Sequence, residues 1–421
     1  MRKTLLGLGM LSLALPFAAS AEAPAARAVL QTYADIAHAV YEDSLLTARA
    51  LQRAVDTLVA QPGEESLAAA REAWREARVP YQQSEVYRFG NPIVDAWEGK
   101  VNAWPLDEGL IDYVAASYGD ASDENRLYAA NVIANPRLKL SGRMVDATEI
   151  TRELLAETLH EIDGVEANVA TGYHAVEFLL WGQDLNGTGP GAGSRPATDF
   201  DPERCTGGHC ARRAAYLETA TALLVDDLRW MTAQWAPEGA ARREVVEGNP
   251  EAGLARILKG MGSLSYGELA GERMKLGLML HDPEEEHDCF SDNTHWSHYY
   301  DVVGIRNVYT GSYERVDGTT VGGPSLAQRV AARDAGVHEA LSQRLDETLE
   351  RMRAIVVAAE AGMAYDQMLA EGNAEGNRRI MAAVEALTAQ TRAIEKAVSA
   401  LGLSPVPFEG SDSLDNPQRV G

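Results

Sequence analysis

The chain has 421 residues, which is more than one ordinary hydrophobic core accommodates, so its length indicates two or three domains. Its 46% hydrophobic and 24% charged residues are typical of a globular protein and exclude wholesale disorder. The 62 acidic side chains outnumber the 38 basic ones, and the formal charge of −24 argues against a nucleic-acid partner because it repels phosphate backbones. Abundant alanine and few β-branched runs favour helices over sheets.

Residues 1–21 have the parts of a secretory signal peptide. Arg2 and Lys3 precede an apolar stretch, and small residues then lead to a predicted cleavage point after Ala21. The apolar stretch is shorter than the ~20 residues that a membrane-spanning helix needs, and no later segment is apolar for long enough. We therefore expect export by the Sec route to the periplasm or the outer-membrane periphery, with no transmembrane segment in the mature chain.

The rest of the chain is dominated by apolar side chains at three- and four-residue spacing, which is the pattern of amphipathic helices. The expected helices are, in chain order, residues 24–60, 65–89, 148–181, 211–236, 249–280, 326–361 and 374–401. Pro62-Gly63 ends the first of them, and Gly164 or Gly172 is expected to interrupt the third. The segments 91–110 and 281–325 lack the pattern and are expected to be irregular.

The composition changes in residues 185–210, which contain six glycines and three prolines and predict a long connection. This change divides the chain into an all-α pair of helical bundles. The expected parts are the signal peptide 1–21, an N-terminal bundle 22–190, a Gly-rich connection 191–210, a C-terminal bundle 211–403 and a loosely held tail 404–421. The halves have the same order of elements without a repeat of residues, so a duplicated fold is a topological hypothesis.

The chain contains three cysteines, Cys205, Cys210 and Cys289. In an oxidising compartment the close pair Cys205 and Cys210 most simply forms a local disulfide. A zinc site would also recruit His209, but no set of four ligands is evident nearby. Cys289 is then left as a free thiol.

His174 and Glu177 are the sharpest local signal for chemistry. They are three residues apart, so on a helix they face the same way. The apolar residues 178–181 predict that this helix is buried, and a buried imidazole and carboxylate need partners. A metal ion is one way to satisfy both, and a hydrogen-bonded His–Glu pair in a bundle core is the other. The spacing alone does not decide between them.

The segment Gly172-Tyr-His-Ala-Val-Glu177 matches the GxHxxE motif of the imelysin family, and the chain resembles the iron-regulated protein A branch of that family over most of its mature length. Further matching segments are Trp104-Pro-Leu-Asp107, Gly191-Ala-Gly-Ser-Arg-Pro196, Cys205-Thr-Gly-Gly-His-Cys-Ala-Arg-Arg213, Gly267-Glu-Leu-Ala-Gly-Glu-Arg-Met274 and Glu286-His-Asp-Cys-Phe-Ser-Asp-Asn-Thr-His295. Asp288 departs from the pattern, which has Ser at this position. The resemblance implies two helical bundles, a functional site near their interface and a role in iron acquisition.

The resemblance also suggests where further metal ligands come from. Glu85 and Asp107 are the candidates, because both lie where the chain returns to the end of the bundle. The alternatives are that Glu85 pairs with Arg78 or Arg88 and that Asp107 caps a turn. With His174 and Glu177 they would form an oxygen-rich site with one nitrogen, for a divalent or trivalent cation. Iron is favoured, and manganese, zinc and calcium remain open.

Residues 281–301 hold a second concentration of titratable side chains. Glu286, His287, Asp292 and His295 are candidates for a second metal site, or for a set that faces the first site across the domain boundary. The alternative is a solvated acidic loop without a ligand.

Two functions from different classes follow. The first is an exported metal-binding protein of bacterial iron uptake, which carries a free ion or a chelate and works with an envelope partner. The second is a metallopeptidase of the insulin-cleaving type, because the imelysin family is classed among peptidases. The inverse zinc motif HxxEH needs a second His after the Glu, and here that position is Phe178. Metal binding without turnover is therefore preferred, and a scaffold role with a vestigial site is a third alternative.

Overall fold

The computed structural model describes residues 23–119, 122, 125–140 and 142–420, so the predicted signal peptide 1–21 lies outside the described residues. Helix accounts for 65% of the structure and strand for 3%. The predicted helical class is confirmed at this level. The duplication of the fold is not shown.

The elements are, in chain order, α1 (Ala26–Ala60), α2 (Glu64–Gln82), η1 (Glu85–Tyr87), α3 (Pro92–Asn102), α4 (Glu108–Ile111), β1 (Arg137–Leu140), β2 (Arg143–Asp146), η2 (Leu154–Leu159), η3 (Ile162–Gly164), α5 (Gly172–Trp181), η4 (Ala197–Phe200), α6 (Cys210–Trp235), α7 (Ala240–Val246), α8 (Pro250–Ser263), η5 (Leu264–Leu276), α9 (Gly277–Leu280), η6 (Pro283–Glu285), α10 (Thr294–Thr310), β3 (Ser312–Glu314), β4 (Thr320–Gly322), α11 (Leu326–Arg333), α12 (Ala335–Glu360), α13 (Tyr365–Leu369), α14 (Ala374–Ala400), α15 (Asp412–Asp415) and η7 (Pro417–Arg419).

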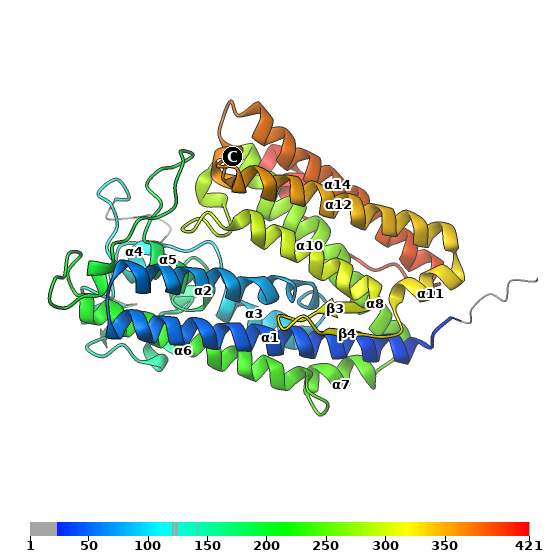
Figure 1. Ribbon diagram of the computed structural model, residues 1–421, viewed down its shortest axis with the longest axis horizontal. Coiled ribbons are helices and arrows are strands. Elements are labelled where there is room, and N and C mark those ends of the chain that lie inside the picture. Colours follow the sequence, from blue (N-terminus) through cyan, green and yellow to red (C-terminus); the bar gives the residue numbers. More distant parts are fainter. Residues whose placement is uncertain (1–22, 120–121, 123–124, 141, 421) are drawn as a thin grey trace, which may run out of the picture.

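One group of helices is built around α1, which packs along both α2 and α6 (Figure 1). Ala34, Ala37 and Ala48 on α1 are completely buried, and their small side chains let the neighbouring helices approach closely. The ring of Tyr87 on η1 lies 5.6 Å from that of Trp235 on α6, which ties this segment to the same core. The short helix α5 packs against α2, α3 and α6.

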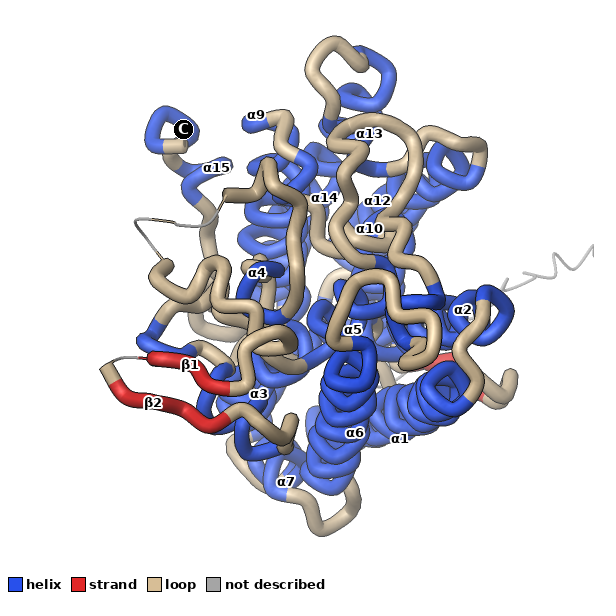
Figure 2. Tube along the Cα trace, turned by 90° about the vertical axis from the view of Figure 1, so that its left-hand side faces the viewer, coloured by secondary structure: helices blue, strands red, loops and turns tan. Residues whose placement is uncertain are grey.

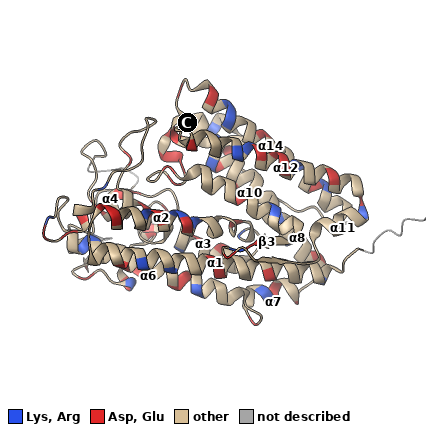
Figure 3. Ribbon diagram, viewed as in Figure 1, with Lys and Arg blue, Asp and Glu red and all other residues tan. Residues whose placement is uncertain are grey.

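The second group of helices consists of α8, η5, α10, α12 and α14. The long helices α12 and α14 lie side by side, and α10 packs between α12 and α2, so that it joins the two groups (Figure 1). The hairpin β3–β4 lies along α1 rather than within the second group. Charged residues of both signs are spread along the outer helices (Figure 3).

The predicted connection 191–210 leads into α6, which packs on α1 and α5. The first helix after the connection therefore shares its core with the N-terminal helices, and the domain boundaries remain a prediction. Residues 404–420 were expected to be loosely held. Instead, the ring of Phe408 packs so closely on Gly262 that a Cβ on this glycine would lie 2.4 Å from the ring. Ser413 is buried, and its hydroxyl donates a hydrogen bond to the carbonyl of Gly271 on η5.

Three predicted segments differ from the observed structure. Residues 91–110 were expected to be irregular, but they contain α3 and the start of α4. Residues 281–325 were expected to be irregular, but they contain α10 and the hairpin β3–β4. The buried face of α10 carries polar side chains such as His298 and Asp301, so an apolar periodicity could not reveal it. Residues 148–181 were expected to be one interrupted helix, and only the part from Gly172 is a regular α-helix.

In the part of the chain that the structure describes, no helix is both long and apolar enough to cross a bilayer.

Cys205 and Cys210 form a disulfide, and Cys289 is a half-buried free thiol. We expect thiol titration of the denatured, unreduced protein to find one thiol per chain, and reduction to raise the number to three. Three thiols before reduction would contradict the pairing.

Candidate metal centre

Gly172 begins α5 and fixes how closely this helix approaches α3. Its φ of +85° is unfavourable for any side chain, and a Cβ would lie 2.5 Å from the carbonyl oxygen of Val101. Glycine is therefore required here on two grounds. All ten residues of α5 are buried, so the polar side chains that follow Gly172 face the interior of the protein.

His174 and Glu177 lie on one face of α5, as their spacing predicts. His174 Nδ1 is 3.1 Å from Glu177 Oε2, and both side chains are at most 1% exposed. The other carboxylate oxygen, Oε1, accepts hydrogen bonds from the Ser291 backbone N–H at 3.0 Å and from its hydroxyl at 2.6 Å. These bonds fasten α5 to the segment that precedes α10. Figure 2 views this end of the molecule, where loops cross in front of α5.

The same segment brings His287 and Asp288 to His174. The imidazole rings of His174 and His287 are 4.7 Å apart, and His287 Nδ1 lies 3.5 Å from Asp288 Oδ1. Asp288 Oδ2 accepts hydrogen bonds from Asn293 and Ser297, and its Oδ1 accepts one from Arg78 Nη2 at 2.8 Å. Asp288 is therefore held rigidly by neighbours from two different elements.

His174, His287 and Asp288 together form a candidate metal centre. One donor atom from each lies within 4.8 Å of the other two, and all three residues are at most 1% exposed. His174 Nε2 has no hydrogen-bond partner among the described residues. Two nitrogens and one oxygen at this separation suit iron, zinc or manganese better than calcium, which prefers an all-oxygen shell.

Burial and nearby charge leave the three side chains in metal-binding protonation states. Burial, followed by the charge of Arg78, lowers the pKa of His174 to about 3, and burial also lowers the pKa of His287 well below its usual value. Burial alone would raise the pKa of Asp288, but Arg78 and the donors around it hold that pKa below the ordinary range. Neutral imidazoles beside an ionised carboxylate are the forms that bind a metal.

A second arginine neutralises carboxylates beyond the centre. Arg273 Nη2 binds Glu85 Oε2 at 2.7 Å and Glu268 Oε1 at 2.7 Å, and its Nη1 lies 3.2 Å from Asp301. Glu85 is therefore held by Arg273, neither by Arg78 nor by Arg88, and it is not among the donors grouped around His174. This pairing corrects the expectation that Glu85 completes the site.

Asp107 also lies outside the centre. It precedes α4, its backbone carbonyl accepts a hydrogen bond from Leu110 N–H, and its side chain accepts one from Asn125. Its carboxylate is not among the donors grouped around His174. These contacts agree better with the alternative in which Asp107 caps a turn.

The predicted second cluster is divided by the structure. His287 lies in the group around His174 and Asp288. Glu286 and Asp292 instead meet Asp366 of α13, with one oxygen from each carboxylate within 4.8 Å of the others. His295 lies 3.5 Å from Glu360 and belongs to neither group. Burial and the charge of Asp292 raise the pKa of Asp366 to about 7.

Sequence reasoning missed Asp288 and Asp366. Asp288 was visible only as a departure from the family pattern, and an acidic residue next to a candidate ligand could have been taken as a signal. Asp366 lies 74 positions after Asp292 in the sequence and had no local signal.

His298 offers a test of how dry this interior is. Its folded-state pKa, lowered to about 3 by burial and by Arg273, lies below the ~6.5 of an unfolded chain. As the pH falls, the His298 side chain therefore takes up a proton in the unfolded state before it does so in the folded state. The folded protein thus loses free energy of unfolding as the pH falls from 6.5 toward 3. Between pH 7 and pH 5, we expect metal-free wild type to lose about 2 kcal/mol more stability than His298→Gln. Urea unfolding at both pH values measures this, and identical changes in the two proteins would contradict it.

The fold and this centre define a class of helical proteins with a buried histidine–carboxylate group beside an HxxE helix. The profile of the Imelysin family matches residues 37–394, and the chain belongs to this family.

Two relatives carry the same description. The chain is 24% identical over 362 residues to "Iron-regulated protein A" of Synechococcus elongatus, an alignment that covers 84% of this chain and 82% of the relative. A crystal structure of a protein assigned as an iron-regulated protein A precursor from Parabacteroides distasonis superimposes with a TM-score of 0.66 at 19% identity. That match covers 91% of this chain and 97% of the other, and it supports the fold alone.

Proposed function

We propose that this chain is an exported metal-binding protein that holds one cation at His174, His287 and Asp288, with Glu177 orienting His174. The observation that carries the proposal is the meeting of three buried donors within 4.8 Å of one another. A carboxylate that receives a hydrogen bond from a ligand imidazole is a common support of metal sites, and Glu177 is placed for that role.

Iron is the favoured metal. The two nitrogens and one oxygen are compatible with it, and the relatives described above are named as iron-regulated. Because the donors are almost completely buried, a bare ion fits this centre better than a bulky chelate. A role in iron uptake, an envelope partner and a periplasmic location reached through the segment 1–21 belong to the same proposal.

The burial of the centre also argues against the metallopeptidase alternative. A peptidase must bring a peptide bond to the metal, but Glu177 and Asp288 are 0% exposed. We expect the zinc-loaded protein to leave insulin intact under conditions in which a known zinc peptidase cleaves it.

Metal analysis of untagged protein purified from the periplasm tests the proposal. With iron added to the medium, wild type should carry close to one equivalent of iron per chain, and His287→Ala should carry far less. Equal iron content in the two proteins, or no iron in either, would contradict the proposed centre.

A further inference from the structure

We propose that Glu286, Asp292 and Asp366 form a second cation site, which takes a hard divalent cation such as Ca²⁺. This inference goes beyond the proposed function, and it does not depend on the histidine centre. The three residues come from the end of η6, the bend before α10 and the start of α13, so a cation there would join three separate parts of the chain.

The first argument for the site is the state of its oxygens. Glu286 and Asp366 are each 1% exposed. Among the described residues, Glu286 Oε1, Asp292 Oδ1 and both carboxylate oxygens of Asp366 have no hydrogen-bond partner. Buried carboxylate oxygens without donors are costly, and three of them close together cost more than their sum because like charges repel. A cation at their centre relieves both costs.

The second argument is the charge around the cluster. The strongest charged neighbours of Glu286 and Asp366 are other carboxylates, among them Asp184 and Asp288. The positive charge of Arg75 lowers the pKa of Asp292, which burial and Asp184 raise. In contrast, Arg78 and Arg273 are already engaged by acids of the histidine centre and of the adjoining network. Among the described residues, no lysine or arginine forms an ion pair with the three carboxylates, and Arg75, the cation that acts on Asp292, is paired with Glu72.

The third argument is access. Asp292 lines a cavity of about 740 Å³, which also contains Gln367, the neighbour of Asp366. An ion and its waters can approach the carboxylates from this cavity. Three carboxylates supply oxygen and no nitrogen or sulfur, and waters from the cavity can complete the six to eight ligands that Ca²⁺ takes. The chemistry thus differs from that of the centre around His174.

Calorimetric titration of the EDTA-stripped full chain with Ca²⁺ at pH 7.5 tests the proposal. We expect one site in wild type and an affinity at least tenfold lower in Asp366→Asn. Asp184→Asn is the matched control, because it removes the same charge near the cluster without removing a ligand, and it should change the affinity less than threefold. Asp292→Asn, at a half-buried position, repeats the test if Asp366→Asn does not fold.

The two sites can fail separately. His174→Ala should retain Ca²⁺ binding while it loses zinc or iron binding, and Asp366→Asn should show the reverse. The proposal is overturned if wild type binds no Ca²⁺, if Asp366→Asn and Asp292→Asn bind it as tightly as wild type, or if Asp184→Asn weakens binding as much as they do.

Discussion

We expect Arg273→Met to lower the free energy of unfolding by about 3–5 kcal/mol, because it leaves buried carboxylates without their counter-charge. Glu85 and Asp301, two of the partners of Arg273, are at most 2% exposed and have little access to water when the guanidinium is removed. Arg273→Lys keeps the charge but not the forked geometry, so it should lose less. Urea unfolding at pH 7 measures all three proteins.

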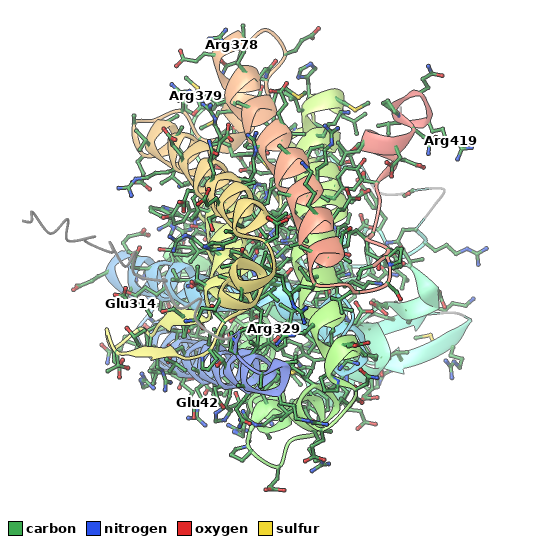
Figure 4. All side chains as sticks on the ribbon, turned by 90° about the vertical axis from the view of Figure 1, so that its right-hand side faces the viewer. Glu42, Glu314, Arg329, Arg378, Arg379 and Arg419 are labelled. Atoms are coloured by element: carbon green, nitrogen blue, oxygen red, sulfur yellow. A yellow bond between two sulfur atoms is a disulfide. The ribbon has the colours of Figure 1, made fainter. Side chains whose placement is uncertain are left out.

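The matched control for this substitution is Arg379→Met. Arg379 lies on α14, where Figure 4 labels it at the edge of the molecule, and it forms an exposed ion pair with Glu375. Exposed pairs of this kind contribute less than about 1 kcal/mol. Equal losses in Arg273→Met and Arg379→Met would mean that the buried network contributes nothing beyond an ordinary surface pair.

The second large effect concerns the metal. We expect His174→Ala to lower the affinity for iron or zinc by well over tenfold, with little change in helix content, because it removes one of three protein donors. Glu177→Gln should lower the affinity by roughly 10- to 100-fold, since it only weakens the orientation of His174. His38→Ala, which removes a partly exposed imidazole of α1, is the matched control and should leave the affinity unchanged. Calorimetry and circular dichroism measure the two quantities.

The structure also changes the expected pH dependence of binding. An ordinary imidazole, with a pKa of ~6.5, would compete for protons below about pH 6 and weaken the metal site. Burial lowers the pKa of His174 to about 3, so proton competition in the folded protein starts at more acidic pH. We therefore expect metal binding to persist at pH 5. A loss of affinity centred near pH 6.5 would show that the centre is hydrated.

The sequence was sufficient for the features that local spacing controls. Helical periodicity predicted α1, α6 and α14 to within two residues at each end, and the three-residue spacing predicted that His174 and Glu177 share a face. Spacing does not determine which distant side chain neutralises a buried charge. Glu85 pairs with Arg273, 188 positions away, and this choice depends on how the two groups of helices pack. His174 and Glu177 on α5 could therefore be found from sequence, while Asp288 and Asp366 required the fold.

Anomalous diffraction from crystals of the metal-free protein soaked in Fe²⁺ or Zn²⁺ tests the central claim most directly. We predict one strong anomalous peak about 2.0–2.3 Å from a nitrogen of His174, a nitrogen of His287 and an oxygen of Asp288. A peak bound elsewhere while these three side chains remain without metal, or no peak at saturating metal, would contradict the claim that they form the metal centre.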